Sequence, residues 1–296
     1  MVGVDIGGTG IVAGLVAADG TIESRAAVPT PAADGPAAVL DAVAAAVSRL
    51  GGGFAAAGVG SAGVVDRESG VVRSATDSIS GWAGTELRAE VAARLGVPVV
   101  VDNDVHAHAL GELWTGAAAG RRHVLFAAVG TGIGGSLVVD GRPHRGAHAV
   151  AGHLGHLPVP AAAGRPCPCG GTGHVEGVGS GPALLAAYRA RGGAATTLPE
   201  VAALAETGDA LAAAVLADGA TALGQALGGL VNAVDPALVL IGGGVAACGP
   251  SWWRPLRNAV TAEVLPAVRG IPVLPGELGG DAAVLGAARM AWEELR

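Results

Sequence analysis

The chain has 296 residues, of which 51% are apolar, 15% are charged and 3% are aromatic, so its mean hydropathy of +0.51 comes from alanine and valine. At about 150 residues per domain, this length predicts two domains. The uncharged stretch from Pro236 to Trp253 is interrupted by Gly242 to Gly244 and by Pro250, so it does not supply the roughly 20 continuous apolar residues of a membrane-spanning helix. The first residues, MVGVDIGGTG, show neither a basic segment nor a cleavage pattern. We therefore expect a cytoplasmic protein without membrane contact.

The charged residues exclude several kinds of chemistry. All 18 basic residues are arginine and 25 residues are acidic, which gives a formal net charge of −7 without any basic run, so nucleic-acid binding is not expected. The absence of lysine excludes Schiff-base catalysis, pyridoxal chemistry and a Walker A loop. Cys167 and Cys169 are close together and Cys248 stands alone, a pattern that favours a metal site in a reducing compartment over a disulfide framework.

The first half of the chain predicts an α/β lobe. Strands are expected at 2–6, 11–17 and 21–27, as a meander with turns at Gly7-Gly8-Thr9 and Asp19-Gly20. They are followed by a helix at 34–50, a strand at 55–60, a helix at 85–95 capped by Thr85, and a strand at 97–101. The last strand ends at Asp102-Asn103-Asp104, where α/β folds place a ligand cleft.

The second half resembles another copy of the first. Strands are expected at 123–129 and 136–140, a loop at 141–180, a helix at 207–234, a strand at 237–241 and a closing helix at 281–295. The loop holds five of the eight histidines together with Cys167 and Cys169. We divide the chain into an N-terminal lobe, 1–117, and a larger C-terminal lobe, 118–296, whose final helix 281–296 is able to pack back on the first lobe.

Two glycine-rich hairpins predict phosphate binding, because glycine lets backbone amides approach phosphate oxygens. The first contains Asp5, Gly7, Gly8 and Thr9, in which the aspartate can hold Mg²⁺ or its waters. The second contains Gly130, Thr131, Gly132 and Gly134. An ordinary hairpin turn remains the alternative for the first run. The second run also matches the dinucleotide pattern G-x-G-x-x-G, but residues 136–139 predict a strand where a Rossmann fold needs a helix, so we exclude NAD.

The order of these segments resembles the actin-like (ribonuclease H-like) fold of two-lobed sugar-kinase ATPases. In that fold each lobe gives one hairpin to the triphosphate and a glycine-rich turn, here Gly242, Gly243 and Gly244, receives the adenosine. The resemblance narrows to the ROK family of bacterial sugar kinases and sugar-responsive repressors, because Gly152-His153-Leu154-Gly155-His156 and the run Cys167 to Glu176 resemble the family signature. His153 stands where most relatives carry a glutamate that touches the sugar, and His174 stands where they carry a zinc cysteine.

The resemblance implies a structural zinc site. The corresponding residues are His156, Cys167, Cys169 and His174, a closed set of two nitrogens and two sulfurs. A loop with unmetallated thiols and surface imidazoles is the alternative. Cys248 is expected to be a small buried residue.

The resemblance also implies the sugar site. Asp104 corresponds to the general base for the 6-hydroxyl of the sugar, and Asn103 corresponds to a residue that binds a neighbouring hydroxyl; a helix cap for 105–116 is the alternative for this pair. Gly63, His153, His156 and Glu176 correspond to further sugar contacts. Whether Ser78 and Trp82 touch the sugar stays open, and Asp102 is expected to be structural.

These features predict an enzyme that uses ATP and Mg²⁺ to phosphorylate the 6-hydroxyl of a hexose or N-acetylhexosamine, usually as a homodimer in this family. We expect N-acetylmannosamine first, because neutral His153 can donate a hydrogen bond and changes the shape beside carbon 2, and glucose second. Polyphosphate as the phosphoryl donor, a degenerate sugar-binding protein and a non-catalytic regulator are the alternatives. Regulators of the family carry a DNA-binding element before the first hairpin, whereas Asp5 already lies in that hairpin.

Overall fold

The computed structural model describes residues 1–295, which form two compact units. The first unit comprises residues 1–120, 141–151 and 277–295, and the second comprises Arg121–Asp140 and Gly152–Gly276. This division differs from the one drawn on the sequence in the segment 141–151, which belongs to the first unit, whereas the final helix packs back on the first unit as the sequence analysis allowed. Contacts that join residues far apart in the sequence decide that assignment.

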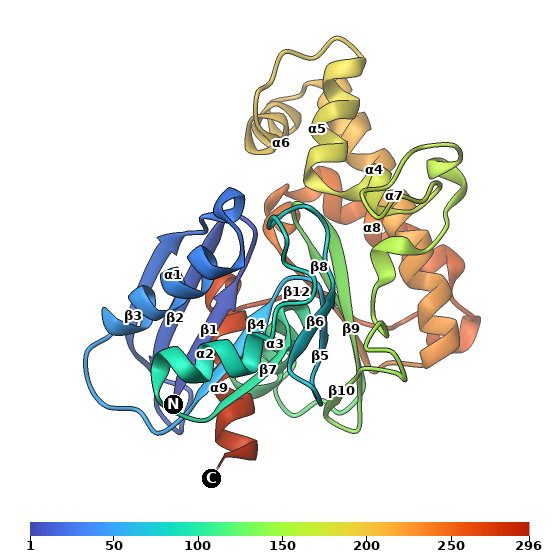
Figure 1. Ribbon diagram of the computed structural model, residues 1–296. Helices are drawn as coiled ribbons and strands as arrows, with labels where there is room; N and C mark the ends of the chain where they lie inside the picture. The colour runs from blue at the N-terminus through green and yellow to red at the C-terminus, as the bar shows by residue number, and fades with distance from the viewer. Residues whose placement is uncertain (296) are drawn as a thin grey trace. The chain divides into compact units, whose positions relative to one another are not determined.

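The sheet of the first unit combines a meander with a parallel extension (Figure 1). Strands β1 (Val2–Ile6), β2 (Gly10–Val16) and β3 (Ile22–Pro29) run antiparallel in turn, as the two short glycine turns predict. Strands β4 (Ala57–Ser61) and β7 (Val99–Asn103) run parallel to β1, so the order is β3-β2-β1-β4-β7. A small hairpin pairs β5 (Val64–Asp66) with β6 (Val71–Ser74).

Four α-helices belong to the described part of the first unit: α1 (Pro36–Ser48), α2 (Leu87–Leu95), α3 (Asp104–Thr115) and α9 (Ala282–Glu294). Helix α9, red in Figure 1, packs on β1, β4 and α3. A Cβ atom on Gly58 of β4 would lie 1.8 Å from the carbonyl oxygen of Ala287, so only glycine permits this approach. The expected cap at Thr85 is wrong, because α2 begins two residues later and the Thr85 hydroxyl is buried without a hydrogen-bond partner among the described residues.

The second unit repeats the topology of the first, which confirms the predicted second copy. Within this unit the strand order is β9-β8-β11-β12. The antiparallel hairpin of β8 (Val124–Val129) and β9 (Ile133–Val139) is extended by the parallel strands β11 (Leu238–Gly242) and β12 (Val273–Pro275). The short strand β10 (Arg142–His144) lies in the segment 141–151, which belongs to the first unit. Because β9 follows the second glycine-rich turn, the exclusion of a Rossmann loop is confirmed.

Four helices of the second unit were not expected from the sequence. These are α4 (Glu176–Gly179), which lies inside the predicted loop 141–180, and α5 (Gly181–Ala190), α6 (Leu198–Glu206) and α8 (Pro250–Glu263), whereas α7 (Ala210–Val234) was predicted. Short 3₁₀ turns are found in the described chain at Ala32–Asp34, Leu154–His156, Pro160–Ala162, Gly244–Ala247, Pro266–Val268 and Gly279–Asp281. Alanine weakens the apolar periodicity of α5 and α6, and Pro255 lies inside α8.

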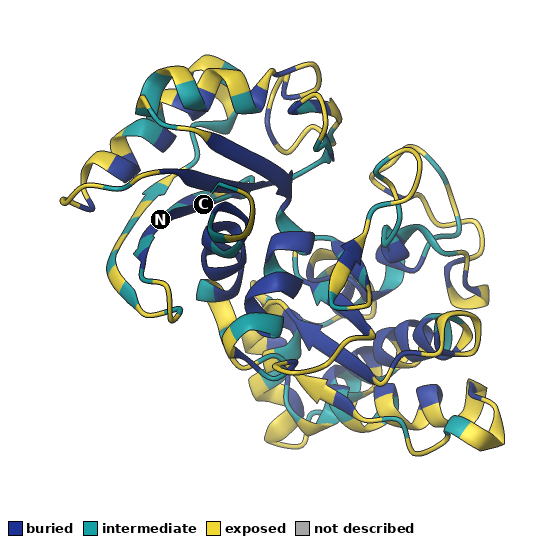
Figure 2. Ribbon diagram, turned by 90° about the horizontal axis from the view of Figure 1, so that it is seen from below, coloured by how far each residue is buried: buried dark blue, intermediate teal, exposed yellow. Residues whose placement is uncertain are grey.

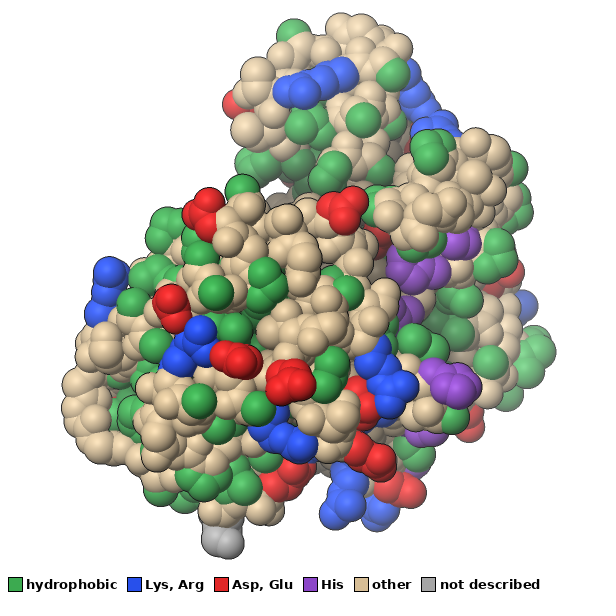
Figure 3. All heavy atoms as spheres, viewed as in Figure 1, with side chains coloured by type: hydrophobic (Ala, Val, Ile, Leu, Met, Phe, Trp, Pro, Cys, Tyr) green, Lys and Arg blue, Asp and Glu red, His purple; other side chains and the backbone are tan. Residues whose placement is uncertain are grey.

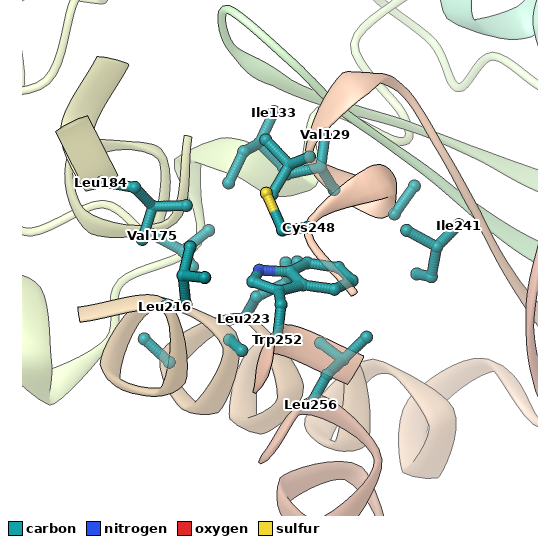
Figure 4. Close-up of a cluster of buried hydrophobic side chains, with 14 of the residues drawn as sticks. Val129, Ile133, Val175, Leu184, Leu216, Leu223, Ile241, Cys248, Trp252 and Leu256 are labelled. Carbon is teal, nitrogen blue, oxygen red and sulfur yellow. The ribbon is translucent and has the colours of Figure 1, made fainter. Parts of the chain in front are cut away.

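Helix α7 runs through the core of the second unit and packs against α8, α6 and α5. By length and composition it is apolar enough to cross a membrane, but half of its most apolar window is buried inside the protein. Trp252 lies fully buried among Leu216, Leu223 and Leu256, beside the sulfur of Cys248 (Figure 4). The central strands and the inward faces of the helices are buried (Figure 2), and Cys248 is the small buried residue that was expected.

Candidate functional site

The pair Asn103-Asp104 stands where β7 ends and α3 begins. Asn103 is the N-cap of α3, and its Oδ1 accepts hydrogen bonds from the amides of Val105 (2.9 Å) and His106 (3.3 Å). Its Nδ2 donates to the carbonyl of Gly63 and to Oδ1 of Asp104, both at 2.9 Å. The cap interpretation is therefore confirmed, and the cap also fixes the Asp104 side chain, because Oδ1 of Asp104 accepts a further bond from the amide of Val105 (2.9 Å).

Asp104 and Asp5 are partly buried carboxylates of the first unit. Burial raises the pKa of Asp104 to about 6, against the opposing effect of its hydrogen bonds to Val105 and Asn103. Burial, followed by the negative charge of Asp104, raises the pKa of Asp5 to about 7. At neutral pH Asp104 is mostly ionised, and its pKa lies close enough to neutrality for an efficient general base.

The first glycine-rich hairpin links β1 to β2. The Gly7 amide donates to the Gly10 carbonyl at 3.0 Å. Thr30 at the end of β3 fixes the turn from outside, because its hydroxyl donates to the Gly7 carbonyl (2.7 Å) and its amide donates to the Thr9 carbonyl (3.2 Å). The turn that carries Gly7, Gly8 and Thr9 is thus held by the hydroxyl and the amide of Thr30.

Asp102 and Trp82 have structural positions. Asp102 is 1% exposed, and its Oδ2 accepts hydrogen bonds from Arg67 (3.0 Å) and Arg145 (2.8 Å). Burial opposes its ionisation, but the bond to Arg145 and the nearby positive charges outweigh this effect and hold the pKa of Asp102 below its usual value. Trp82 is 1% exposed and its Nε1 donates to the Ser61 hydroxyl at 3.0 Å. The structural role expected for Asp102 is confirmed, and Trp82 belongs to the core.

The second hairpin, Gly130 to Gly135, joins β8 to β9. The Gly130 amide donates to the Gly132 carbonyl (2.9 Å), and the Gly130 carbonyl accepts from the amide of Gly181 (2.8 Å) at the start of α5. Gly243 lies against the end of β8 with a φ of 86°, and a Cβ atom there would lie 2.4 Å from the Val129 carbonyl oxygen. The glycine turn after β11 therefore packs beside the hairpin, which brings Gly130 to Gly134 and Gly242 to Gly244 together.

Glu176 connects the cysteine-containing loop to this hairpin. Its side chain is buried, and its Oε2 accepts a hydrogen bond from the amide of Ile133 at 2.7 Å. Its Oε1 lies 3.8 Å from Sγ of Cys167. The family resemblance implies a sugar contact at Glu176, whereas the structure shows a contact with the hairpin backbone that no sequence signal indicated.

Four side chains of the second unit form a possible metal centre. The donor atoms of His156, Cys167, Cys169 and His174 all lie within 4.8 Å of one another. Sγ of Cys167 lies 3.6 Å from Nδ1 of His156, and Sγ of Cys169 lies 3.3 Å from Nδ1 of His174. Tetrahedral zinc with ordinary Zn–S and Zn–N bonds separates a sulfur from a nitrogen by about 3.6 Å, so the four residues fit zinc. Histidine side chains gather at the surface shown in Figure 3.

A pocket of about 280 Å³ lies beside the glycine turn after β11 and was not expected from the sequence. It is formed by α6 and the segment 244–249, and its lining residues are Leu198, Pro199, Ala202, Ala203, Glu206, Gly244, Ala247, Cys248 and Gly249. Helix α6 does carry a start signal, because Thr197 accepts a hydrogen bond from the amide of Glu200 and Pro199 follows in the first turn. This N-cap pattern predicts a helix from about residue 198. That helix forms one wall of the pocket.

The structure thus sorts the candidate residues into two groups. The first unit holds Asp5, Gly7, Gly8, Thr9, Gly63, Asn103 and Asp104, and the second holds the other hairpin, the glycine turn, the metal cluster, His153 and Glu176. The rings of His153 and His156 are stacked with centroids 6.3 Å apart. The first group offers a proton acceptor and the second offers a glycine-rich turn beside a mostly apolar pocket.

Comparison with known proteins gives matches over nearly the whole chain. The model of the ROK family matches residues 1–294. A glucokinase of Halalkalibacterium halodurans is 34% identical over 96% of this chain and 92% of its own length, and an N-acetyl-D-glucosamine kinase of Escherichia coli O6:H1 is 32% identical over 95% of each chain. The crystal structure of a ROK family glucokinase from Streptomyces griseus with glucose and AMPPNP is 33% identical, covers 99% of each chain and gives a TM-score of 0.88.

Proposed function

Because the chain belongs to the ROK family, we propose that it transfers the γ-phosphoryl group of ATP to the 6-hydroxyl of glucose. The coarser part of this statement, a ROK sugar kinase with the actin-like ATPase fold, follows directly from the whole-chain similarity to such kinases. Glucose is supported by the 34% identity to a glucokinase and by the 33% identity to a structure that contains glucose and AMPPNP.

Asp104 is the proposed general base. In the reaction the 6-oxygen of the sugar forms a bond to the γ-phosphorus, the bond from that phosphorus to the β,γ-bridging oxygen breaks, and the hydroxyl proton passes to the carboxylate. The observation that carries this role is the fixed and desolvated carboxylate of Asp104, whose bonds to Asn103 and Val105 all fall on Oδ1 in the described structure. Oδ2 is then the oxygen that receives the proton. Asn103 is proposed to orient the sugar while it caps α3.

The two hairpins are proposed to bind the phosphates of ATP. Backbone amides around Gly7 to Thr9 and Gly130 to Gly134 provide donors without side-chain bulk. Adenine is placed in the mostly apolar pocket beside Gly244, between Leu198 and Ala202 on α6 and Ala247 on the opposite wall. Mg²⁺, when bound, would neutralise phosphate charge, and Asp5 is the residue proposed to hold it or its waters.

Zinc is proposed to be structural. The set of two nitrogens and two sulfurs leaves no open position for a reacting water. The cluster would fix the loop in which His156 lies three residues after His153, so the metal acts on the sugar site through the loop and takes no part in the reaction.

N-acetylmannosamine is the second candidate substrate, and His153 is the observation that favours it. On the sequence alone N-acetylmannosamine ranks first, because His153 replaces the glutamate of most relatives. The similarity to glucokinases over the whole chain outweighs that single residue, so glucose now ranks first.

A coupled ATP assay tests both candidates. The purified chain is given glucose, mannose, N-acetylglucosamine and N-acetylmannosamine in turn, and ADP formation is followed at fixed Mg²⁺. We expect kcat/KM for glucose to exceed that for N-acetylmannosamine at least tenfold. The reverse ranking would restore the amino sugar as the substrate, and no sugar-dependent ADP formation with any of the four would contradict the proposed function.

A further inference from the structure

Glu176 holds the second hairpin directly, and this contact does not involve a sugar. Its Oε2 lies 2.7 Å from the amide nitrogen of Ile133, the first residue of β9 after the turn. Glu176 is 8% exposed, so water does not easily replace this hydrogen bond. Loss of the carboxylate would leave the buried Ile133 amide without its acceptor, which costs more than a hydrogen bond normally contributes.

The turn itself is shaped around this carboxylate. A Cβ atom built on Gly132 would lie 2.7 Å from Oε2 of Glu176, so the hairpin backbone passes as close to the carboxylate as glycine allows. The two contacts fall on neighbouring residues of the turn, one through the Ile133 amide and one through the bare Gly132 backbone. The carboxylate therefore defines where this half of the turn lies.

The other end of Glu176 is anchored in the loop that carries the metal cluster. Oε1 lies 3.8 Å from Sγ of Cys167, and Glu176 is the first residue of the short helix α4. Two backbone bonds brace that helix, from the amide of Gly177 to the carbonyl of His174 (3.0 Å) and from the amide of Gly179 to that of Val175 (2.8 Å). The carboxylate is thus fixed by the loop through Oε1 and binds the hairpin backbone through Oε2.

We propose that Glu176 is a positioning residue for ATP, which preorganises the Gly130 to Gly135 hairpin for the phosphates whether or not a sugar is bound. The proposal rests on the proposed function, since it assigns that hairpin to ATP. It differs from the role expected for Glu176 on the sequence, which is a contact with sugar hydroxyls. If Glu176 acts only through the sugar, replacing it leaves the affinity for the nucleotide in the absence of sugar unchanged. If Glu176 shapes the hairpin, the same replacement lowers that affinity.

The experiment measures the affinity of the full chain for AMPPNP and Mg²⁺ by calorimetry without sugar. Wild type is compared with Glu176→Ala, Glu176→Asp and Glu176→Gln, and Glu263→Ala serves as the control because Glu263 is an exposed carboxylate of the same unit. We expect the alanine and aspartate variants to lose about ten- to a hundredfold in affinity, because they leave the buried Ile133 amide without its acceptor. Glutamine retains an oxygen that accepts from the Ile133 amide, so Glu176→Gln should remain within about threefold of wild type.

Several outcomes would overturn the proposal. AMPPNP affinity that is unchanged in Glu176→Ala and Glu176→Asp, with only the KM for sugar raised, would return Glu176 to a sugar contact alone. A loss in Glu176→Gln as large as in Glu176→Ala would show that the bond to the Ile133 amide is not responsible. If Glu176→Ala does not fold, as judged by near-ultraviolet circular dichroism, Glu176→Asp provides the same comparison. Failure of wild type itself to bind AMPPNP or to phosphorylate any sugar would contradict the proposed function instead.

Discussion

Replacing Asp104 by Asn should abolish most of the activity and stabilise the fold at the same time. Asparagine has the same shape, and its Oδ1 can still accept the bonds from Val105 and Asn103 that Asp104 accepts at 2.9 Å. The variant therefore keeps the cap of α3 and loses only the ionisable oxygen. Removal of a general base lowers the rate by about 10² to 10⁴-fold.

The gain in stability follows from the pKa of Asp104. Its value of about 6 in the folded chain compares with 3.8 for an unperturbed aspartate, which corresponds to about 3 kcal/mol of unfavourable ionisation in the native state at high pH. Because the folded pKa is raised, the native state binds the proton more tightly than the unfolded state does. The penalty is complete above about pH 6 and disappears as the pH falls towards 4. The free energy of unfolding of Asp104→Asn should thus exceed that of wild type by up to about 3 kcal/mol at pH 8. At pH 4 the two free energies should differ little.

Two measurements test this reasoning. Urea unfolding of wild type, Asp104→Asn and the control Asp34→Asn, which replaces an exposed carboxylate, gives the free energy of unfolding at pH 8 and pH 4. The pH profile of kcat/KM for wild type should fall below about pH 6, as Asp104 becomes protonated. The reasoning is refuted if Asp104→Asn is less stable than wild type at pH 8 while its circular dichroism is native, or if it retains more than a tenth of the wild-type kcat.

Three further predictions concern the metal, the packing and the sugar. Elemental analysis should find about one zinc per chain in wild type and none in Cys167→Ser; stoichiometric zinc in the variant that lacks both Cys167 and Cys169 would contradict the ligand set. Gly58→Ala should lower the free energy of unfolding by about 3 kcal/mol or more, since its Cβ atom would lie 1.8 Å from the Ala287 carbonyl oxygen, whereas Gly53→Ala, with nothing within 4 Å, should be neutral in the same urea titration. His153→Glu should shift the ratio of kcat/KM values towards glucose or N-acetylglucosamine and away from N-acetylmannosamine, and an unchanged ratio would mean that residue 153 does not select the sugar.

Local patterns in the sequence were sufficient for the parts of the site that lie in short turns. Each hairpin is a run of glycine and threonine between apolar strands, so its position can be read from neighbouring residues. Asn103-Asp104 follows a fully apolar strand, which places it at the end of β7, as the structure confirms. A possible metal centre was indicated by Cys167 and Cys169, close together in a chain of three cysteines, and the structure brings their sulfurs together with the side chains of His156 and His174.

Helices α5, α6 and α8 were missed for a physical reason. In the alanine-rich segments of α5 and α6 several faces of the helix are apolar, which weakens the period of 3.6 residues. Helix α8 instead carries Pro255 inside it, a residue that normally ends a helix. The wrong prediction for Thr85 has a different origin, because a residue type alone does not show where the first helical turn begins. The pocket beside Gly244 was missed together with α6, although Thr197 and Glu200 provide a start signal for that helix.

The tertiary structure alone decided which distant residues meet. Asp102 is neutralised by Arg145, 43 positions later, and Glu176 reaches the Ile133 amide, 43 positions earlier. Helix α9 from the end of the chain packs on β1 and β4 from its beginning, through glycines whose close approach leaves no local signal. A sequence pattern reports the preferences of a residue and its near neighbours, whereas these contacts depend on the path of the whole chain. The sequence by itself therefore determined the kind of enzyme and its chemical groups, and only the fold decided how those groups are held.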